Sequence, residues 1–297
     1  MRLDQDRVRD DRQTKEAILC RIPVFRPVAV KLLRLLQGED SNVLEVGELL
    51  NTDPALSAEV LTMANSAAYT TSNRINTISK AIMMLGTERT KSLATKAALD
   101  GMRRAIGNHP VIELCWVHSR ATAVIAEWLS PFYRIHPDRA YTAGLMHDVV
   151  RLGLLALNCG QYAKLLDCTA GTNEELLAAE QLVFRVDHCT AGLWLMNTWG
   201  LPEEFGVACS QHHAGKDAVQ EPVADLVRLA CALAQATGHK AAPLVHSLTM
   251  ESLLEEIPDL ARPDSPYPLA TLSLRLQAEL GGPLLTAGGS ERFSAVN

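Results

Sequence analysis

The sequence lacks the features that mark membrane, secreted and β-rich proteins. No apolar run approaches the roughly 18 residues that a bilayer-spanning helix needs, and the charged N-terminus MRLDQDRVRDDRQ is not a secretory signal. Seven cysteines are scattered without CxxC spacing, which favours free thiols in a reducing cytoplasm over a disulfide framework. Apolar–polar alternation between hairpin turns is also missing. We therefore expect a cytoplasmic, all-α protein without a membrane partner.

Charge and composition indicate a globular protein and argue against a nucleic-acid-binding one. The 297 residues are 47% hydrophobic and 21% charged, which is close to the globular average and predicts a substantial core. The formal net charge is −6, whereas broad nucleic-acid binding needs a concentrated basic face. The short basic stretch Arg103-Arg104 stands without a helix-turn-helix signature. We therefore do not expect nucleic acid as a partner.

Apolar residues recur at helical spacing along most of the chain, and caps and breakers divide them into segments. Asp53-Pro54 is an N-cap followed by proline at the first helical position. Thr172 with Glu175 three residues later is a capping box. We predict helices over residues 28–36, 44–50, 54–64, 79–85, 87–106, 110–129, 137–157, 172–199, 203–213, 223–236, 249–256 and 266–280. The break over 107–110 divides them into two lobes.

Histidines and aspartates recur in order along the second lobe. They are His118, the pair His147-Asp148, His188, the pair His212-His213, and Asp225. Imidazole nitrogen and carboxylate oxygen are the usual ligands of borderline and hard divalent metals. A helical fold can supply such ligands from different helices, as metal sites in bundles do. The ordered series therefore makes these seven residues candidate metal ligands.

Each of these residues, taken alone, has a simpler explanation. His118 and His188 could be neutral core histidines, Asp225 could cap or pair near the start of its helix, and His212-His213 could be a polar helix end. Taken together, burying that much imidazole and carboxylate without compensation costs free energy. A shared metal ion or a connected hydrogen-bond network both remain open as the explanation.

Longer stretches resemble the bacterial HDOD (HD-related output) domain, a branch of the HD superfamily of metal-dependent phosphohydrolases. They are IPVFRPVAVKLLRLL (22–36), NTDPALSAEVLTMANSAAY (51–69), INTISKAIMMLGTERTKSL (75–93), CWVHSRATAVIAEWL (115–129), AYTAGLMHDVVRLGLL (140–155), FRVDHCTAGLWLMNTWGLPEEF (184–205) and QHH (211–213). The DPALSAEVLTMANSA stretch is the most specific, because a generic HD hydrolase has no reason to carry it. The resemblance covers about residues 20 to 240.

The resemblance implies an all-helical signal-transduction output module in which an N-terminal lobe packs on an HD-like lobe. Such modules often occur with receiver, sensor or cyclic-di-GMP domains, so signalling proteins of these kinds are the expected partners, and a homo-oligomer is left open. We divide the chain into a charged extension (1–20), the HDOD domain (21–240, with lobes 21–107 and 108–240), C-terminal helices (241–281) and a tail (282–297).

The resemblance also assigns the candidate ligands by position. His118, His147, Asp148 and Asp225 match the ligands of the first metal in HD enzymes. His188, His212 and His213 match the additional ligands of the HD-GYP cyclic-di-GMP phosphodiesterases. The implied cofactor is a divalent metal such as Fe, Mn, Zn or Ni.

Three departures from the HD-GYP pattern weigh against catalysis. Val149-Val150-Arg151 stands where Ile-Gly-Lys follows the His-Asp pair, the Gly-Tyr-Pro loop is replaced by residues 214–217, and Leu114 stands where an acidic ligand is expected. We therefore favour a non-catalytic signalling module. The alternative is a metal-dependent phosphohydrolase acting on a nucleotide or cyclic dinucleotide, in which Arg151 and Lys216 would hold phosphate.

Overall fold

Helices and turns make up the described part of the chain, which contains no strand, so the predicted all-α class is confirmed. The structure, a computed structural model, describes residues 31, 34, 35, 43–52, 54–65, 75–168, 171–242, 249–258 and 269–280. Most of the predicted helix 28–36, the cap Asp53, the extension 1–20 and the tail 282–297 lie outside these residues. None of the described helices is both long and apolar enough to cross a membrane.

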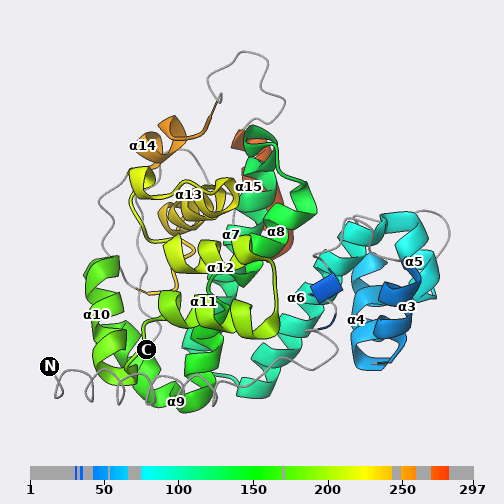
Figure 1. Cartoon of the computed structure of the whole chain (residues 1–297), viewed down its shortest axis with the longest axis horizontal. Helices are drawn as coiled ribbons and strands as arrows, with labels where there is room; N and C mark the ends of the chain where they lie inside the picture. Colours follow the sequence, from blue (N-terminus) through cyan, green and yellow to red (C-terminus); the bar gives the residue numbers. More distant parts are fainter. Residues whose placement is uncertain are drawn as a thin grey trace, which may run out of the picture.

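A small N-terminal lobe contains α3 (Val43–Asn51), α4 (Pro54–Ala64) and α5 (Ile78–Leu85), which lie together on one side of the molecule (Figure 1). The Asn65 side chain ties the end of α4 to the start of the next segment, because its amide donates to the Ile75 carbonyl and its oxygen accepts from the Ile75 N–H. Thr77 caps α5 by accepting from the Lys80 N–H. Gly86 ends α5 at a φ of +82°, a conformation that favours glycine. These caps explain why the predicted short helix ends where it does.

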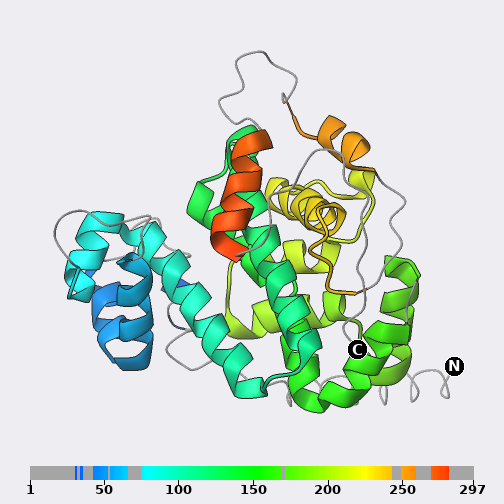
Figure 2. The ribbon, with the colours of Figure 1, turned by 180° about the vertical axis from the view of Figure 1, so that it is seen from behind.

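The long helix α6 (Thr87–Ile106) connects the two lobes. It packs against α4 and α5 at one end and against α8 and α9 of the larger lobe, as Figure 2 shows from behind. Its bounds agree with the predicted helix 87–106. A second link comes from Arg34, whose Nε donates to the Trp199 carbonyl at 2.6 Å.

The larger lobe is built around α7. Its elements are α7 (Pro110–Tyr133), α8 (Pro137–Met146), α9 (Val149–Cys168), α10 (Asn173–Phe184), α11 (His188–Trp199), α12 (Glu203–Gln211), the 3-10 turn η1 (Lys216–Ala218), α13 (Pro222–Ala236), α14 (Met250–Glu255) and α15 (Leu269–Leu280). Helices α8, α13 and α15 pack directly on α7. The core of this lobe therefore lies between α7 and the helices that pack on it.

Helix α8 approaches α7 closely because Gly144 has no side chain. A Cβ at Gly144 would lie 2.9 Å from both the Ala123 Cα and the Thr122 carbonyl oxygen. No real Cβ tolerates such a distance, so any other residue would push the two helices apart. The close approach brings the end of α8, and with it the His147-Asp148 pair, next to the middle of α7.

Helix α7 runs to Tyr133, so the predicted break at Ser130-Pro131 is wrong. Pro131 lacks the N–H that would bond the Glu127 carbonyl. The Ser130 hydroxyl donates to that carbonyl instead, at 2.7 Å. The side chain thus supplies the missing hydrogen bond, and the last turn continues past the proline.

Two predicted long helices are each divided. The segment 137–157 ends as α8 at Met146 and restarts as α9 at Val149, with the His147-Asp148 pair in the turn. The segment 172–199 keeps the predicted Thr172 capping box, but divides into α10 and α11. Arg185 adopts a left-handed conformation there, and Asp187 caps α11 by accepting from the Thr190 N–H at 2.8 Å.

Candidate metal centre

Six of the seven candidate ligands meet inside the larger lobe, each at or near a helix end except His118. His118 lies in the middle of α7. His147 caps the end of α8 and Asp148 follows it in the turn. His188 opens α11, and His212 caps the end of α12 with His213 after it. The division of the two long helices therefore places His147, Asp148 and His188 at helix ends, from which they can face His118 and His212.

The carboxylate of Asp148 is the centre on which four imidazoles converge. The Nε2 atoms of His118 and His147 lie 3.8 and 3.7 Å from Oδ2. Those of His188 and His212 lie 3.5 and 3.3 Å from Oδ1. All five residues are at most 2% exposed. The arrangement is thus a buried shell of nitrogen atoms around one carboxylate.

Backbone carbonyls orient three of the imidazoles through Nδ1. The Nδ1 atoms of His118, His147 and His212 lie 2.7, 2.7 and 2.8 Å from the carbonyl oxygens of His239, Gly144 and Cys209. A carbonyl only accepts, so each Nδ1 carries the proton and each Nε2 keeps its lone pair. Metal-ligating histidines are held in the same way.

His188 is held by a carboxylate that the sequence did not reveal. Glu180 on α10 accepts through Oε2 from His188 Nδ1 at 2.6 Å and from the His188 backbone N–H at 2.8 Å. The Tyr162 hydroxyl donates to the other oxygen, Oε1, at 2.6 Å. Glu180 is fully buried, yet in the sequence it is an ordinary helical glutamate. Only the packing of α10 against α9 and α11 identifies it.

Arg151 lies within the cluster and is 1% exposed. Its Nε stands 2.7 Å from Asp148 Oδ2, and its Nη2 stands 3.1 Å from His188 Nε2 and 3.5 Å from His213 Nε2. The guanidinium therefore neutralises Asp148 inside the protein. This placement differs from the phosphate-holding role that the sequence suggested for Arg151.

Cys231 on α13 is a further donor that sequence reasoning missed. Its Sγ lies 3.5 Å from His118 Nε2, and the donor atoms of His118, His147 and Cys231 all lie within 4.8 Å of one another. Cys189 stands similarly beside His188, with 3.6 Å between Sγ and Nε2. Cys231 lies in an apolar run and Cys189 follows His188, and neither shows CxxC spacing, so no recognised ligand motif distinguished them from structural thiols.

Asp225 does not join the cluster. Its Oδ2 accepts from the Tyr133 hydroxyl and its Oδ1 from Arg228 Nε, both at 2.9 Å. Cys231 follows Asp225 by six positions, so the two side chains point roughly 120° apart around α13. Lys216, the second residue suggested for phosphate, is exposed on η1. The described geometry thus assigns other partners to Asp225 and leaves Lys216 at the surface.

Two buried nitrogen atoms of the cluster, His147 Nε2 and Arg151 Nη1, make no hydrogen bond. The carboxylate oxygens of Asp148 make none either, although Oδ2 is ion-paired with Arg151 Nε at 2.7 Å. Buried groups of this kind are normally satisfied, and here the acceptor atoms face one another across short distances. A cation among them would satisfy His147 and Asp148 together. The nitrogen, oxygen and sulfur donors present fit a borderline divalent metal.

Burial and neighbouring charge shift the pKa values of the cluster. Burial lowers the pKa of His118 to about 4 against the opposing attraction of Asp148, and it also lowers the pKa values of His147, His212 and His213. Burial would raise the pKa of Asp148, but Arg151 and His147 outweigh it and hold that pKa well below its usual range. These four imidazoles are therefore neutral beside an ionised carboxylate, which is the form that binds a metal, whereas, despite burial, Cys189 and Glu180 raise the pKa of His188 to about 10.

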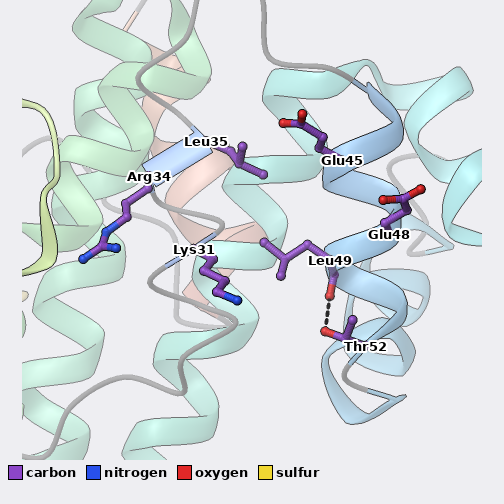
Figure 3. A pocket seen from close by; sticks show the side chains of 7 residues that line it. All are labelled: Lys31, Arg34, Leu35, Glu45, Glu48, Leu49 and Thr52. Carbon is purple, nitrogen blue, oxygen red and sulfur yellow. Dashed lines mark hydrogen bonds between the residues drawn. The ribbon is translucent and has the colours of Figure 1, made fainter.

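A separate groove of about 450 Å³ lies in the N-terminal lobe, away from the cluster (Figure 3). It is lined by Lys31, Arg34, Leu35, Glu45, Glu48, Leu49 and Thr52. In Figure 3 Leu35 and Leu49 point toward each other, whereas Arg34 extends toward the larger lobe. The groove contains none of the candidate ligands, so it has no part in the chemistry of the cluster.

Comparisons with known proteins agree with this architecture. A family model of the HDOD domain matches residues 22–215. No curated protein matches the chain.

Similar solved structures include an HDOD domain protein with unknown function from Geobacter sulfurreducens, with 23% identity, a TM-score of 0.70, and coverage of 93% of this chain and 90% of that chain. A candidate phosphohydrolase from Shewanella amazonensis SB2B has 23% identity, a TM-score of 0.65, and coverage of 89% and 93%. A candidate signal transduction protein from Marinobacter aquaeolei VT8 has 18% identity, a TM-score of 0.66, and coverage of 91% and 63%. At these identities the likeness concerns the fold.

Proposed function

The chain belongs to the HDOD domain family, and we propose that it is a signal-transduction output module that acts by binding a protein or a nucleotide and not by hydrolysis. The observation that carries this proposal is the ion pair between Arg151 and Asp148 inside the His/Asp cluster, with 2.7 Å between Nε and Oδ2. In a phosphohydrolase Asp148 would bind the metal and Arg151 would hold the phosphate. Here the two side chains neutralise each other instead.

Burial of the cluster supports the same conclusion. His118, His147, Asp148, His188 and His212 are at most 2% exposed. A phosphoester substrate has to place its phosphorus atom within contact distance of the catalytic groups, and ligand sites are therefore open clefts. A centre enclosed by its own side chains suits a structural or sensing role better than turnover.

The surface of the N-terminal lobe supports a binding role. On α5, Met83 is 84% exposed and Met84 is 42% exposed. Exposed methionines are adaptable contacts at binding surfaces. By contrast, Arg103 and Arg104 form ion pairs with Asp100, and Arg103 also with Glu113. This part of the surface therefore favours a protein partner, such as a receiver or cyclic-di-GMP-related signalling protein, over nucleic acid.

The test is a hydrolysis assay on the full chain. Protein purified without chelator is supplied in turn with Mn²⁺, Fe²⁺, Zn²⁺ and Ni²⁺ and offered bis(p-nitrophenyl) phosphate and cyclic dinucleotides. We expect no turnover above the protein-free blank, and no difference between the wild type and Asp148→Ala. Metal-dependent turnover that disappears in Asp148→Ala would overturn the proposal.

The alternative is a metal-dependent phosphohydrolase acting on a nucleotide or cyclic dinucleotide. It is supported by the convergence of His118, His147, Asp148, His188 and His212 in one buried shell. A bound divalent metal would supply Lewis-acid activation in such an enzyme. For this function Arg151 would have to leave Asp148, so turnover in the assay above is the outcome that distinguishes the two.

A further inference from the structure

We propose that the cluster binds a single thiophilic divalent ion of the zinc type through His118, His147 and Cys231, and that Arg151, which is paired with Asp148, occupies the space where a second ion would lie. This ligand set contains a sulfur atom and omits Asp225. The inference concerns metal binding alone and does not depend on whether the protein hydrolyses a phosphoester.

The distances between the donor atoms fit one tetrahedral ion. Ligand atoms bonded at about 2.0–2.3 Å to a tetrahedral ion lie roughly 3.3–3.8 Å from one another. His118 Nε2 lies 3.5 Å from Cys231 Sγ, which is within this range. The donor atoms of His118, His147 and Cys231 all lie within 4.8 Å of one another. The protein thus brings the three donors close enough for one ion to draw them together, with the fourth position left to water.

Neighbouring groups hold the proposed ligands in the orientation for binding. The Nδ1 atoms of His118 and His147 are occupied by backbone carbonyls, which directs both Nε2 lone pairs inward. Burial raises the pKa of the Cys231 thiol, and the Gln235 side-chain amide opposes this shift by donating to Sγ at 3.3 Å. These interactions are of the kind that support a metal ligand from outside.

One buried atom of the proposed ligand set has no partner. His147 Nε2 makes no hydrogen bond, although His147 is only 1% exposed. Leaving such an atom unpaired costs free energy. An ion between His118, His147 and Cys231 would pair this nitrogen.

Arg151 explains why only one ion is expected. Its Nη2 lies 3.1 Å from His188 Nε2 and 3.5 Å from His213 Nε2, so it occupies two donors of the second group, which consists of His188, Cys189, His212 and His213. A divalent ion there would face a buried positive charge at short range. Arg151 Nε meanwhile keeps Asp148 paired through Oδ2 at 2.7 Å.

The sulfur ligand also selects the metal. Thiolate with imidazole suits Zn²⁺, Co²⁺ and Fe²⁺, whereas Mg²⁺, Ca²⁺ and Mn²⁺ prefer oxygen ligands. We therefore expect Zn²⁺ to displace bound Co²⁺ and a large excess of Mn²⁺ to leave it in place.

The test is a Co²⁺ titration of the full chain after removal of metal with a chelator. We expect one equivalent to bind, with a near-ultraviolet sulfur-to-cobalt charge-transfer band and the strong visible bands of tetrahedral coordination. Cys231→Ser should lose the charge-transfer band and bind Co²⁺ at least about tenfold more weakly, since losing even an outer partner of a ligand costs that much.

Three variants serve as controls. Cys209→Ser replaces an equally buried thiol, whose contact with the Met146 carbonyl a hydroxyl can also make, and Asp225→Asn removes the aspartate outside the cluster. Both should keep the wild-type spectrum and affinity. Cys189→Ser distinguishes the two donor groups and remains informative if Cys231→Ser does not fold. The proposal is overturned if wild-type protein binds no Co²⁺ or two equivalents, if it shows no sulfur band, or if Cys189→Ser abolishes that band.

Discussion

Asp148 and Arg151 neutralise each other in the interior of the larger lobe, with exposures of 2% and 1%. Arg151 keeps the pKa of Asp148 low despite burial, and Asp148 raises the pKa of Arg151, which burial would otherwise lower. Each residue thus remains charged because of the other. A buried charge whose partner is removed has neither water nor a counterion to stabilise it.

Replacing Arg151 alone should therefore destabilise the protein strongly. We expect Arg151→Met to lower the free energy of unfolding by about 3–5 kcal/mol, the usual cost of breaking a buried pair. Asp148→Asn in the same chain should restore part of that loss, because it removes the uncompensated charge. Denaturant unfolding of chelator-treated protein measures both effects.

A surface pair provides the matched control. Arg139 contacts Glu204 near the surface, where the Arg139 side chain is 54% exposed, so Arg139→Met should cost less than about 1 kcal/mol. Equal losses in Arg151→Met and Arg139→Met, or no recovery in the double variant, would contradict the description of the buried pair.

The sequence identified the residues of the cluster that belong to a recurring chemical pattern and missed those that contribute through packing alone. The adjacent His147-Asp148 pair is visible in the sequence, as is the order of the histidines. Glu180 and Cys231 carry no such pattern, because a glutamate in a helix and a cysteine in an apolar run are common. Asp225 carries a carboxylate that could bind a metal. Whether it faces the cluster depends on which side of α13 packs on α7, and the neighbouring sequence does not show this.

At the scale of the helices, the contact between α7 and α8 positions the cluster. Gly144 permits this contact, since a Cβ there would lie 2.9 Å from backbone atoms of α7. The Gly144 carbonyl also accepts from His147 Nδ1. One residue thus sets both the distance between the helices and the orientation of the imidazole that follows it.

Gly144→Ala should therefore cost about 1–3 kcal/mol of stability, the range for forcing an extra group into a packed core. Because the substitution also displaces His147, it should weaken Co²⁺ binding in the same experiment. Gly101→Ala in α6 is the control: a Cβ there meets no atom within 4 Å, and alanine is favoured over glycine in helices by roughly 0.5–1 kcal/mol. Thermal unfolding should move in opposite directions for the two variants.

Helix ends were predictable where a local cap defines them and unpredictable where tertiary contacts do. Thr77, Gly86 and Thr172 act through atoms within four residues, and the predicted ends agree with the structure. The turn at His147-Asp148 interrupts a continuous apolar pattern, and it is stabilised by Arg151 and by histidines from other helices. Apolar periodicity gives no information about these distant partners. It therefore predicted one continuous helix where the structure has α8 and α9.

At the scale of the whole molecule, the cluster and the exposed N-terminal lobe are separate parts joined by α6 (Figure 2). Helix α6 packs against α4 and α5 on one side and against α8 and α9 on the other. The turn that holds Asp148 lies between α8 and α9. A displacement of α8 or α9 at this turn would act directly on α6, so the proposed sensing role has a continuous path of contacts between the two parts.

The buried histidines also make the stability of the whole fold depend on pH. In the unfolded chain each imidazole titrates near pH 6.5, whereas in the folded protein the pKa of His118 is about 4, and burial lowers those of His147, His212 and His213 as well. Below pH 6.5 the unfolded state therefore binds protons that the folded state does not. His188, whose pKa is raised despite burial to about 10 beside Cys189 and Glu180, is largely protonated in both states below pH 6.5. It therefore adds little to the pH dependence of stability in that range.

Stability should consequently fall as the pH is lowered from about 6.5 to about 4, because proton uptake favours the unfolded chain. His118 alone should account for about 3 kcal/mol, since burial lowers its pKa from 6.5 in the unfolded chain to about 4 in the folded protein. Denaturant unfolding of chelator-treated protein at a series of pH values measures the slope, and His118→Gln should make it shallower. A flat profile across this range, or an unchanged slope in His118→Gln, would mean that the imidazoles are not held neutral in the core. Saturating Zn²⁺ should steepen the fall, because protons then compete with the metal for the same nitrogen atoms.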